Sequence, residues 1–199
     1  MRLLKWFFII AALVFIVYLV GPSPDTPMYK TTMPAVPAAP ALLIAFVKNN
    51  EAQHKLKPNN EARIIWANDS LKQKTEYAIV YLHGFSASQQ EGNPIHINIA
   101  KEFGCNLYLS RLAEHGIDTT EPMANLTAES YWESAKLALA TGKQLGDKII
   151  LMATSTGGTN ALQLAATYPQ DIAALVLTQI LQLNNICQAV PIFVNANAT

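Results

Sequence analysis

Short apolar runs recur along the chain between residues 61 and 177 and alternate with longer segments that have helical periodicity. The apolar runs have the length and composition of buried strands and lie at residues 62–67, 78–82, 105–110, 148–152 and 172–177. The segments that read as helices lie at residues 94–103, 127–145 and 159–167. Strands that alternate with helices predict an α/β fold with a mostly parallel sheet of about five strands, flanked by helices.

Residues 1–20 have a different pattern, in which a basic start is followed by a long apolar span. Residues 3–20 contain Lys5 as their only charged residue, and their length approaches the ~20 apolar residues that a transmembrane helix requires. Arg2 and Lys5 favour a cytoplasmic N-terminus, so the rest of the chain is expected outside the cytoplasm, in the periplasm if the cell is Gram-negative. The block is therefore predicted to be a single-pass transmembrane helix that acts as a signal anchor.

A cleaved signal peptide is the alternative for this block. Such a peptide has an apolar region of about 7–15 residues that ends in an Ala-x-Ala-like cleavage site. The block instead ends in Tyr-Leu-Val-Gly-Pro at residues 18–22, which lacks such a site. An uncleaved anchor is therefore the favoured interpretation.

Two segments separate the apolar block from the predicted core at residues 61–177. Residues 21–40 contain six prolines, and proline fixes φ and removes a backbone donor, so this segment is predicted to be an extended spacer that holds the domain off the membrane. Residues 41–60 are predicted to form an amphipathic helix followed by a turn at Pro58-Asn59-Asn60. The core is followed by a tail at residues 178–199.

The composition excludes several classes of function. The chain has 14 basic and 14 acidic residues, so no excess charge favours a nucleic-acid partner. Its two cysteines make no disulfide framework, and no spacing of Cys, His, Asp or Glu resembles a metal site. No Gly-x-Gly-x-x-Gly loop is present. The sequence therefore predicts neither a metal nor another cofactor, and the expected partners are a membrane and a small-molecule substrate.

One stretch, residues 153–158, carries a chemical signal. It reads Ala-Thr-Ser-Thr-Gly-Gly and lies between the strand at 148–152 and the helix at 159–167. A serine at a sharp strand-to-helix turn, with small residues two places before and after it, is the pattern of a nucleophile elbow. Ala153 stands where glycine is usual, and it is still small enough for the close approach of the two backbones. The alternative is a loop rich in glycine, serine and threonine that has no catalytic role.

A second stretch, His83-Gly84-Phe85, follows another predicted strand. Together the two stretches resemble the α/β-hydrolase family, in particular its esterase, lipase and lysophospholipase-like members, over about residues 61–177. The resemblance implies that Ser155 is the nucleophile and that the backbone amides of Phe85 and Thr156 form the oxyanion hole. It also implies hydrolysis of a carboxylic ester, such as a lysophospholipid or an acylglycerol.

The resemblance bears on other polar residues as well. It implies that His83 shapes its loop and is not the general base, because the family takes its base from much later in the chain. The segment Arg111–Asp118 resembles a family loop beside the active site, and Asp118 is expected to be structural there. His96, on the predicted helix at 94–103, is expected at the surface or in a groove.

A serine nucleophile needs a base, and the family's chain order is serine, then acid, then histidine. After Ser155 the sequence contains one acidic residue, Asp171, and no histidine. Asp171 precedes the strand at 172–177 and is therefore expected at the wrong end of the sheet. The resemblance accordingly implies the N-terminal portion of a hydrolase, truncated after about five core strands.

The tail at residues 178–199 has no clean periodicity and no charged side chain. Residues 178–182 can be back-translated so that one restored base gives Ser-Pro-Asn, which family members tend to carry after this strand. The hypothesis is a frameshift or a sequence error, and the alternative is a natural short paralogue. The predicted function is that of a membrane-anchored serine esterase, with a catalytically inactive remnant or a binding module on the same fold as the alternative.

Overall fold

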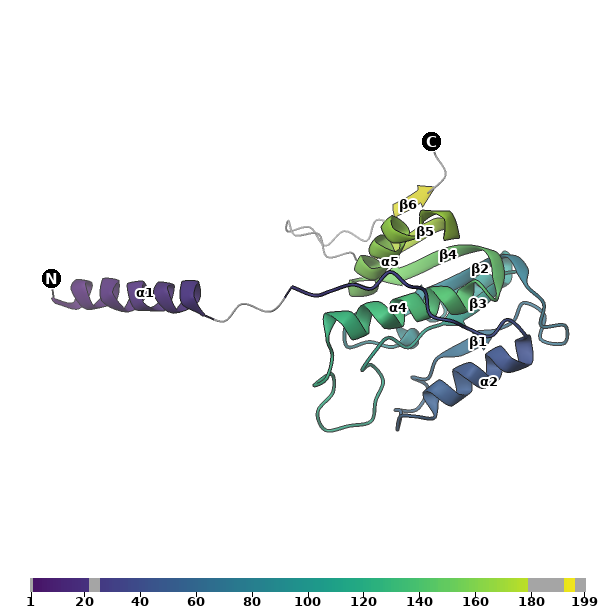
Figure 1. The fold of residues 1–199 in the computed structure, drawn as a ribbon, viewed down its shortest axis with the longest axis horizontal. Coiled ribbons are helices and arrows are strands. Elements are labelled where there is room, and N and C mark those ends of the chain that lie inside the picture. The colour runs from purple at the N-terminus through teal and green to yellow at the C-terminus, as the bar shows by residue number, and fades with distance from the viewer. Residues whose placement is uncertain (1, 22–25, 179–191, 196–199) are drawn as a thin grey trace.

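Six strands form one sheet in the order β1-β3-β2-β4-β5-β6 in the computed structural model, which describes residues 2–21, 26–178 and 192–195 (Figure 1). The strands are β1 (Arg63–Ile65), β2 (Thr75–Leu82), β3 (Asn106–Leu109), β4 (Gly146–Thr154), β5 (Ile172–Thr178) and β6 (Ile192–Asn195). The central strands β3, β2, β4 and β5 run parallel, and β1 and β6 pair antiparallel at the two edges. The predicted α/β fold with a mostly parallel sheet is therefore confirmed.

The tail differs from its prediction in one respect. No strand was expected after residue 178, yet β6 pairs with β5 over four residue pairs from Ala174 to Leu177. The predicted frameshift falls on residues 178–182, and of these only Thr178 belongs to the described residues. The aberrant character of the tail therefore stays a prediction.

Five α-helices and two short 3₁₀ turns accompany the sheet in the described ranges. They are α1 (Arg2–Val20), α2 (Pro40–Glu51), η1 (Gln89–Gly92), α3 (Ile95–Glu102), α4 (Ala128–Gly142), α5 (Thr156–Thr167) and η2 (Pro169–Asp171). At the start of α4 the Thr127 Oγ1 accepts a hydrogen bond from the Ser130 N–H (3.0 Å), and the Ser130 Oγ accepts one from the Thr127 N–H (3.1 Å). This reciprocal cap satisfies two amides at the start of the helix.

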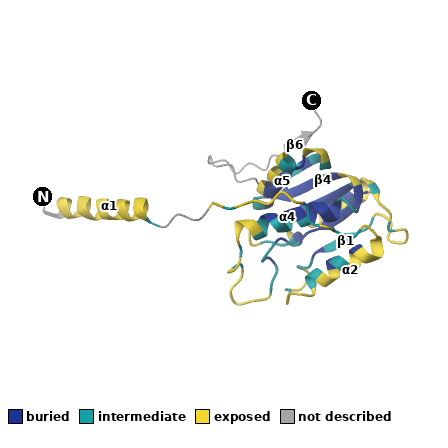
Figure 2. Cartoon of the chain, viewed as in Figure 1, coloured by how far each residue is buried: buried dark blue, intermediate teal, exposed yellow. Residues whose placement is uncertain are grey.

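The centre of the sheet is buried on both faces (Figure 2). Along β2, the side chains of Ala78, Val80 and Leu82 belong to a core cluster shared with α2, α4 and α5. Ile79 and Tyr81 belong to a second cluster, shared with α3. Because successive side chains of a strand point to opposite faces, a strand between two helical layers must be apolar at every position. The unbroken apolar runs that predicted these strands are a consequence of this two-sided burial.

α1 exposes its apolar side chains. Phe7, Val14 and Val17, for example, are 64%, 64% and 70% exposed. Among the residues that the structure describes, no helix has the combination of length and hydropathy that crossing a membrane requires. The structure therefore confirms a helix in the N-terminal block and does not support the prediction that this helix spans a membrane.

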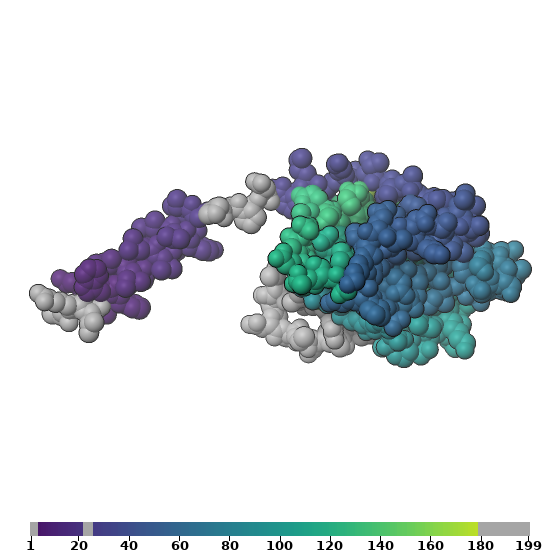
Figure 3. Space-filling model, turned by 90° about the horizontal axis from the view of Figure 1, so that it is seen from below, coloured from purple at the N-terminus to yellow at the C-terminus, as the bar shows by residue number. Residues whose placement is uncertain are grey.

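Residues 26–38, which we call the strap, contain no helix or strand and lie against the domain (Figures 1 and 3). Three consecutive backbone carbonyls of the strap accept hydrogen bonds from side chains of the domain. The bonds run from Trp132 Nε1 to Lys30 O (2.9 Å), from Tyr168 Oη to Thr31 O (2.6 Å) and from Lys136 Nζ to Thr32 O (2.9 Å). Met33 and Val36 also pack against the core. The carbonyls that proline-rich backbone leaves unpaired are thus satisfied by the domain itself.

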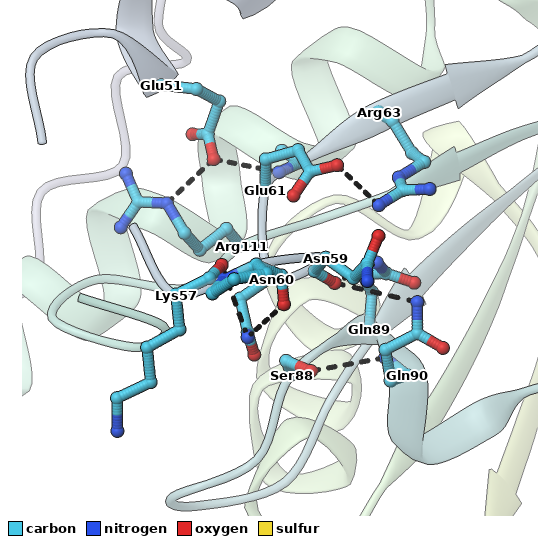
Figure 4. A network of polar contacts seen from close by, with 12 residues as sticks. Glu51, Lys57, Asn59, Asn60, Glu61, Arg63, Ser88, Gln89, Gln90 and Arg111 are labelled. Atoms are coloured by element: carbon cyan, nitrogen blue, oxygen red, sulfur yellow. Dashed lines mark hydrogen bonds and ion pairs between the residues drawn. The ribbon is translucent and has the colours of Figure 1, made fainter. Parts of the chain in front are cut away.

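A buried ion pair connects α2 to the loop at Arg111–Asp118 (Figure 4). The Glu51 carboxylate accepts hydrogen bonds from Arg111 Nε and from the Ala62 N–H, both at 2.8 Å. The two charged side chains are only 8% and 13% exposed. Removing one partner of such a pair leaves an uncompensated buried charge, so the contact fixes this loop relative to the sheet.

Candidate active site

Ser155 forms the turn between β4 and α5, and its backbone has φ 51° and ψ −118°. This conformation is costly for a residue with a Cβ and persists only where the surrounding structure determines it. The Ser155 N–H donates a hydrogen bond to Thr178 O (3.0 Å), and Ser155 O accepts one from the Gly158 N–H (2.9 Å). The strand-to-helix turn predicted at Ser155 is therefore present, and we call residues 153–157 the elbow.

The elbow leaves no room for a side chain two places after the serine. A Cβ on Gly157 would lie 2.3 Å from Leu82 O and 2.5 Å from His83 O. α5 therefore starts directly against the backbone at the end of β2. Ala153, two places before the serine, is fully buried. The small residues of the motif thus have a physical cause in the contact of backbone with backbone.

The loop at His83-Gly84-Phe85 contacts the elbow. A Cβ on Gly84 would lie 3.3 Å from Ser155 Cβ, so the two sequence motifs meet in space. Within the described part of the chain, neither the Phe85 N–H nor the Thr156 N–H donates a hydrogen bond. Unpaired amides beside a nucleophile are the donors that stabilise an oxyanion. The assignment of these two amides to an oxyanion hole stays a prediction.

Both ring nitrogens of His83 contact the backbone. Nδ1 lies 2.9 Å from Gly84 O, and Nε2 lies 3.1 Å from the Leu112 nitrogen. Because the Leu112 N–H can only donate, Nε2 is the acceptor, and Nδ1 carries the proton and donates to Gly84 O. Burial lowers the pKa of His83 to about 4, so the ring is neutral at ordinary pH. His83 has no free nitrogen for a proton transfer, which agrees with a role in shaping the loop.

The loop at Arg111–Asp118 contributes His115 to the same neighbourhood. The centroid of the His115 ring lies 4.8 Å from that of His83, 6.0 Å from that of Phe85 and 5.7 Å from that of Tyr131. Burial lowers the pKa of His115 as well. This loop therefore lies beside the two motifs, where the sequence placed it.

His96 departs from its prediction. It was expected at the surface or in a groove, but it is fully buried, and its Nε2 lies 2.7 Å from Gln89 O. Its ring packs edge-on against Tyr81 of β2, with 4.8 Å between the centroids. The Gln89 carbonyl supplies the hydrogen-bond partner that makes burial of an imidazole tolerable.

The two acids that the sequence analysis discussed have lysine partners. Asp118 Oδ2 lies 2.6 Å from Lys55 Nζ, and Asp171 Oδ1 lies 2.7 Å from Lys143 Nζ. The hydrogen bond and the positive charge of Lys55 lower the pKa of Asp118. Asp171 precedes β5 and so lies at the end of the sheet opposite Ser155, as predicted.

Sequence reasoning missed Glu91. Its Oε2 accepts a hydrogen bond from the Gly84 N–H (2.8 Å) and lies 3.4 Å from Tyr81 Oη. The position of a Cβ on Gly84 lies 3.1 Å from Glu91 Oε1 and 3.3 Å from Ser155 Cβ, so the carboxylate and the serine flank the same glycine. No sequence signal marks this contact, because the partner is a backbone amide that any residue other than proline offers.

Polar side chains connect the ends of the neighbouring strands at this edge of the sheet. Tyr81 Oη lies 3.0 Å from Thr154 Oγ1, which lies 3.0 Å from Thr178 Oγ1. Tyr131 Oη lies 3.1 Å from Thr156 Oγ1 at the first residue of α5. These contacts fix the side chains on either side of Ser155 in the sequence.

An uncharged cavity of about 250 Å³ adjoins Thr156. It lies between α4, α5 and the strap, and Tyr29, Trp132 and Asn160 are among the residues that line it. Across residues 2–21, 26–178 and 192–195, no three His, Cys, Asp or Glu side chains group so that they could hold a metal ion. The described groups around Ser155 are therefore suited to hydrogen bonding and not to metal ligation.

No protein-family model matches the chain, and no curated protein matches it significantly. Solved structures do match. A structure from work on LipS and LipT, two metagenome-derived lipolytic enzymes, is 21% identical with a TM-score of 0.55, over 63% of this chain and 48% of the other. MenH from S. aureus is 23% identical with a TM-score of 0.43, over 60% of this chain and 42% of its own. Est1E from Butyrivibrio proteoclasticus, with bound ferulic acid, is 16% identical with a TM-score of 0.48, over 69% of this chain and 64% of its own.

The likeness to the lipolytic enzyme shows the α/β-hydrolase fold, and the fold predicted from the two motifs is therefore confirmed. The chain spans between 42% and 64% of the length of these structures. At these identities the likeness concerns the fold alone.

Proposed function

We propose that this chain, which has the α/β-hydrolase fold, is part of a serine hydrolase that acts on carboxylic esters. Ser155 is the nucleophile, and the N–H groups of Phe85 and Thr156 are the oxyanion donors. The observation that carries the proposal is the strained Ser155 backbone, with φ 51°, at a turn packed against the His-Gly-Phe loop. The lipolytic neighbour favours an ester such as a lysophospholipid or an acylglycerol.

The chemistry requires a group that takes the proton of the Ser155 hydroxyl as it attacks the ester carbonyl. The sequence has no histidine after Ser155. His83 has both ring nitrogens engaged, and the second nitrogens of His96 and His115 are buried without a hydrogen-bond partner among the described residues. The 199-residue chain alone is therefore expected to retain only the catalysis that survives loss of a triad, about 10³–10⁴-fold over water.

A second candidate follows from the same sequence fact. A chain with an elbow and no downstream histidine is also what a catalytically inactive remnant, or a binding module on this fold, would have. The two candidates differ in whether Ser155 becomes reactive when an acid and a base are supplied.

The test compares this chain with the product of a gene in which one base is restored at codons 178–182. The longer product should react with a fluorophosphonate probe at Ser155 and hydrolyse a short-chain p-nitrophenyl ester. Ser155→Ala should abolish both reactions, and the 199-residue chain should react weakly. A longer product that does not label would favour the binding module, and strong labelling of the 199-residue chain would assign the base to His83, His96 or His115.

Membrane attachment through residues 3–20 is part of the proposal, with the N-terminus in the cytoplasm and the domain outside it. Its support is the basic start at Arg2 and Lys5 and the exposed apolar surface of α1, because large exposed apolar surfaces mark contacts with membranes or proteins. Carbonate extraction should leave the chain in the membrane pellet. Release into the supernatant, or a mature N-terminus near Gly21, would contradict attachment.

A further inference from the structure

Glu91 projects from a turn that is anchored on two sides. Gln89, two residues before Glu91 in η1, is 1% exposed, and its Nε2 donates a hydrogen bond to Asn59 O (2.8 Å, Figure 4). Its own carbonyl lies 2.7 Å from His96 Nε2 on α3. The turn begins at Ser88, whose Oγ accepts from the Gln90 N–H (3.3 Å). These contacts fix the backbone that carries Glu91.

The residue after Glu91 has no room for a side chain. A Cβ on Gly92 would lie 2.5 Å from His96 Cδ2 and 2.7 Å from Tyr81 Cζ. The backbone of η1 therefore rests directly on two buried rings, of which Tyr81 belongs to β2. A turn built in this way places an exposed carboxylate at a defined position beside Gly84.

The two peptide groups that flank Gly84 are each held by a side chain. The first carries the Gly84 N–H, which donates to Glu91 Oε2 at 2.8 Å, and a hydrogen bond to a carboxylate is stronger than one between neutral groups. The second carries the Gly84 carbonyl, which accepts from His83 Nδ1 at 2.9 Å. A peptide group is planar, so fixing the Gly84 carbonyl also fixes the direction of the Phe85 N–H on the same group.

We propose that Glu91 is a positioning residue for the predicted oxyanion loop. Its carboxylate fixes the first peptide plane, His83 fixes the second, and together they set the direction of the Phe85 N–H before a substrate arrives. The carboxylate also occupies the Gly84 N–H, whereas the Phe85 N–H donates no hydrogen bond to a described residue. This inference rests on the proposed function for its catalytic meaning, and on the contacts of Gly84 for its geometry.

Tyr81 strengthens the connection to the serine. Its hydroxyl lies 3.4 Å from Glu91 Oε2 and 3.0 Å from Thr154 Oγ1, the residue before Ser155. The carboxylate is thus linked both to the loop and to the elbow. A change at Glu91 is expected to disturb the two motifs together.

The test measures amide hydrogen exchange at Gly84 and Phe85 by NMR in the full chain and in the variants Glu91→Gln and Glu91→Ala. Exchange at Gly84 should be about 10-fold faster or more in Glu91→Ala, and intermediate in Glu91→Gln, which keeps a neutral acceptor. Glu102→Gln is the matched control, because Glu102 is exposed and its side chain makes no hydrogen bond or ion pair with a described residue. The thermal midpoint should stay within a few degrees in all variants, since Glu91 and Glu102 are exposed residues.

The same substitutions are then made in the longer product of the restored gene, and Ser155 is labelled with a fluorophosphonate. A labelling rate about 10-fold lower in Glu91→Ala, with partial rescue in Glu91→Gln, supports the positioning role. Equal protection of the Gly84 amide in the wild type and in Glu91→Ala overturns the proposal, as does an equal change in the Glu102→Gln control. If no variant labels, including the wild type, the proposed function fails, and the exchange data alone still decide whether Glu91 sets the loop.

Discussion

The elbow and the strap are both places where one backbone segment lies against another part of the molecule, but they are held in opposite ways. At the elbow, Gly157 touches the carbonyls of Leu82 and His83 with no side chain between them. At the strap, side chains of the domain reach out to successive carbonyls of residues 30–32. The elbow contact requires that residue 157 has no side chain, whereas the strap contact requires the side chains that donate the hydrogen bonds.

This difference decides how each contact responds to substitution. A backbone contact without space cannot easily adapt to an added methyl group, because Leu82 is the last residue of β2 and is paired with β4. A contact made of three separate side-chain hydrogen bonds loses them one at a time, each at a modest cost. A single substitution at the elbow should therefore cause a large loss of stability, whereas each substitution at the strap should cause a small one.

The largest effect is expected at Gly157. In Gly157→Ala the new Cβ would lie 2.3 Å from Leu82 O, and overpacking of this kind should cost about 3 kcal/mol or more of unfolding free energy. Urea unfolding should measure the loss. Thr159→Ala, at an exposed position of the same helix, is the control and should change stability by about 0.5 kcal/mol or less. A Gly157→Ala protein as stable as the control would mean that β2 and α5 are less closely packed than described.

The second effect is a pH dependence of the free energy of unfolding, which we expect from His83 in the loop beside the elbow. Burial lowers the pKa of His83 to about 4, whereas an unfolded histidine titrates near 6.5. Below about pH 6.5, His83 is protonated in the unfolded chain but stays neutral in the folded chain until about pH 4. The free energy of unfolding therefore decreases from about pH 6.5 to about pH 4 and does not change with His83 above pH 7. The loss attributable to His83 should reach at most about 3 kcal/mol.

The pH effect is measured by urea unfolding between about pH 7 and pH 4. His83→Gln should reduce the slope of the profile, because glutamine does not titrate in this range, whereas the other histidines remain. His54→Gln, at an exposed histidine after α2, should leave the profile unchanged. A profile with the same slope in both variants would place the pH dependence elsewhere, for example at His96 or His115, whose pKa values burial also lowers.

The elbow was predictable from the sequence and the strap was not, for a reason that lies in sequence distance. The elbow is encoded by neighbouring residues: a strand, then Ser155, then Gly157, then a helix. The strap is encoded by residues about a hundred positions away, since Trp132 and Lys136 bind the carbonyls of Lys30 and Thr32. Carbonyls are common to all residues, so nothing in the strap itself identifies its partners.

The same reasoning explains the other errors of the sequence analysis. His96 looked like a polar position on a helix, and only the Gln89 carbonyl makes its burial favourable. Glu91 looked like a charge in a short loop, and only the Gly84 N–H gives it a place beside Ser155. In each case the deciding partner is backbone. Patterns of side chains predict the sheet and the elbow, and they do not predict which polar side chain finds which peptide group.

A smaller effect is expected at Lys136, the buried lysine of the strap contact. Its ammonium donates to Thr32 O at 2.9 Å and pairs with Glu133 Oε1 at 2.8 Å. Lys136→Met keeps most of the apolar volume but leaves the Thr32 carbonyl unpaired, which should cost about 1–3 kcal/mol. The strap should also become more susceptible to limited proteolysis. Lys101→Met, at an exposed lysine of α3, is the control, and equal cleavage in both proteins would show that Lys136 does not hold the strap.

The smallest effect is expected at Tyr168, where a single neutral hydrogen bond can be removed without changing the packing. Tyr168→Phe deletes the hydroxyl that donates to Thr31 O (2.6 Å) and keeps the ring that stacks on Trp132, with 6.4 Å between the centroids. The loss should be about 1 kcal/mol. If the strap is held by independent bonds, the double variant Lys136→Met with Tyr168→Phe should lose the sum of the two single losses. If the double variant loses much more stability than that sum, the strap detaches as one unit. The strap and the elbow would then differ only in how much stability a substitution costs.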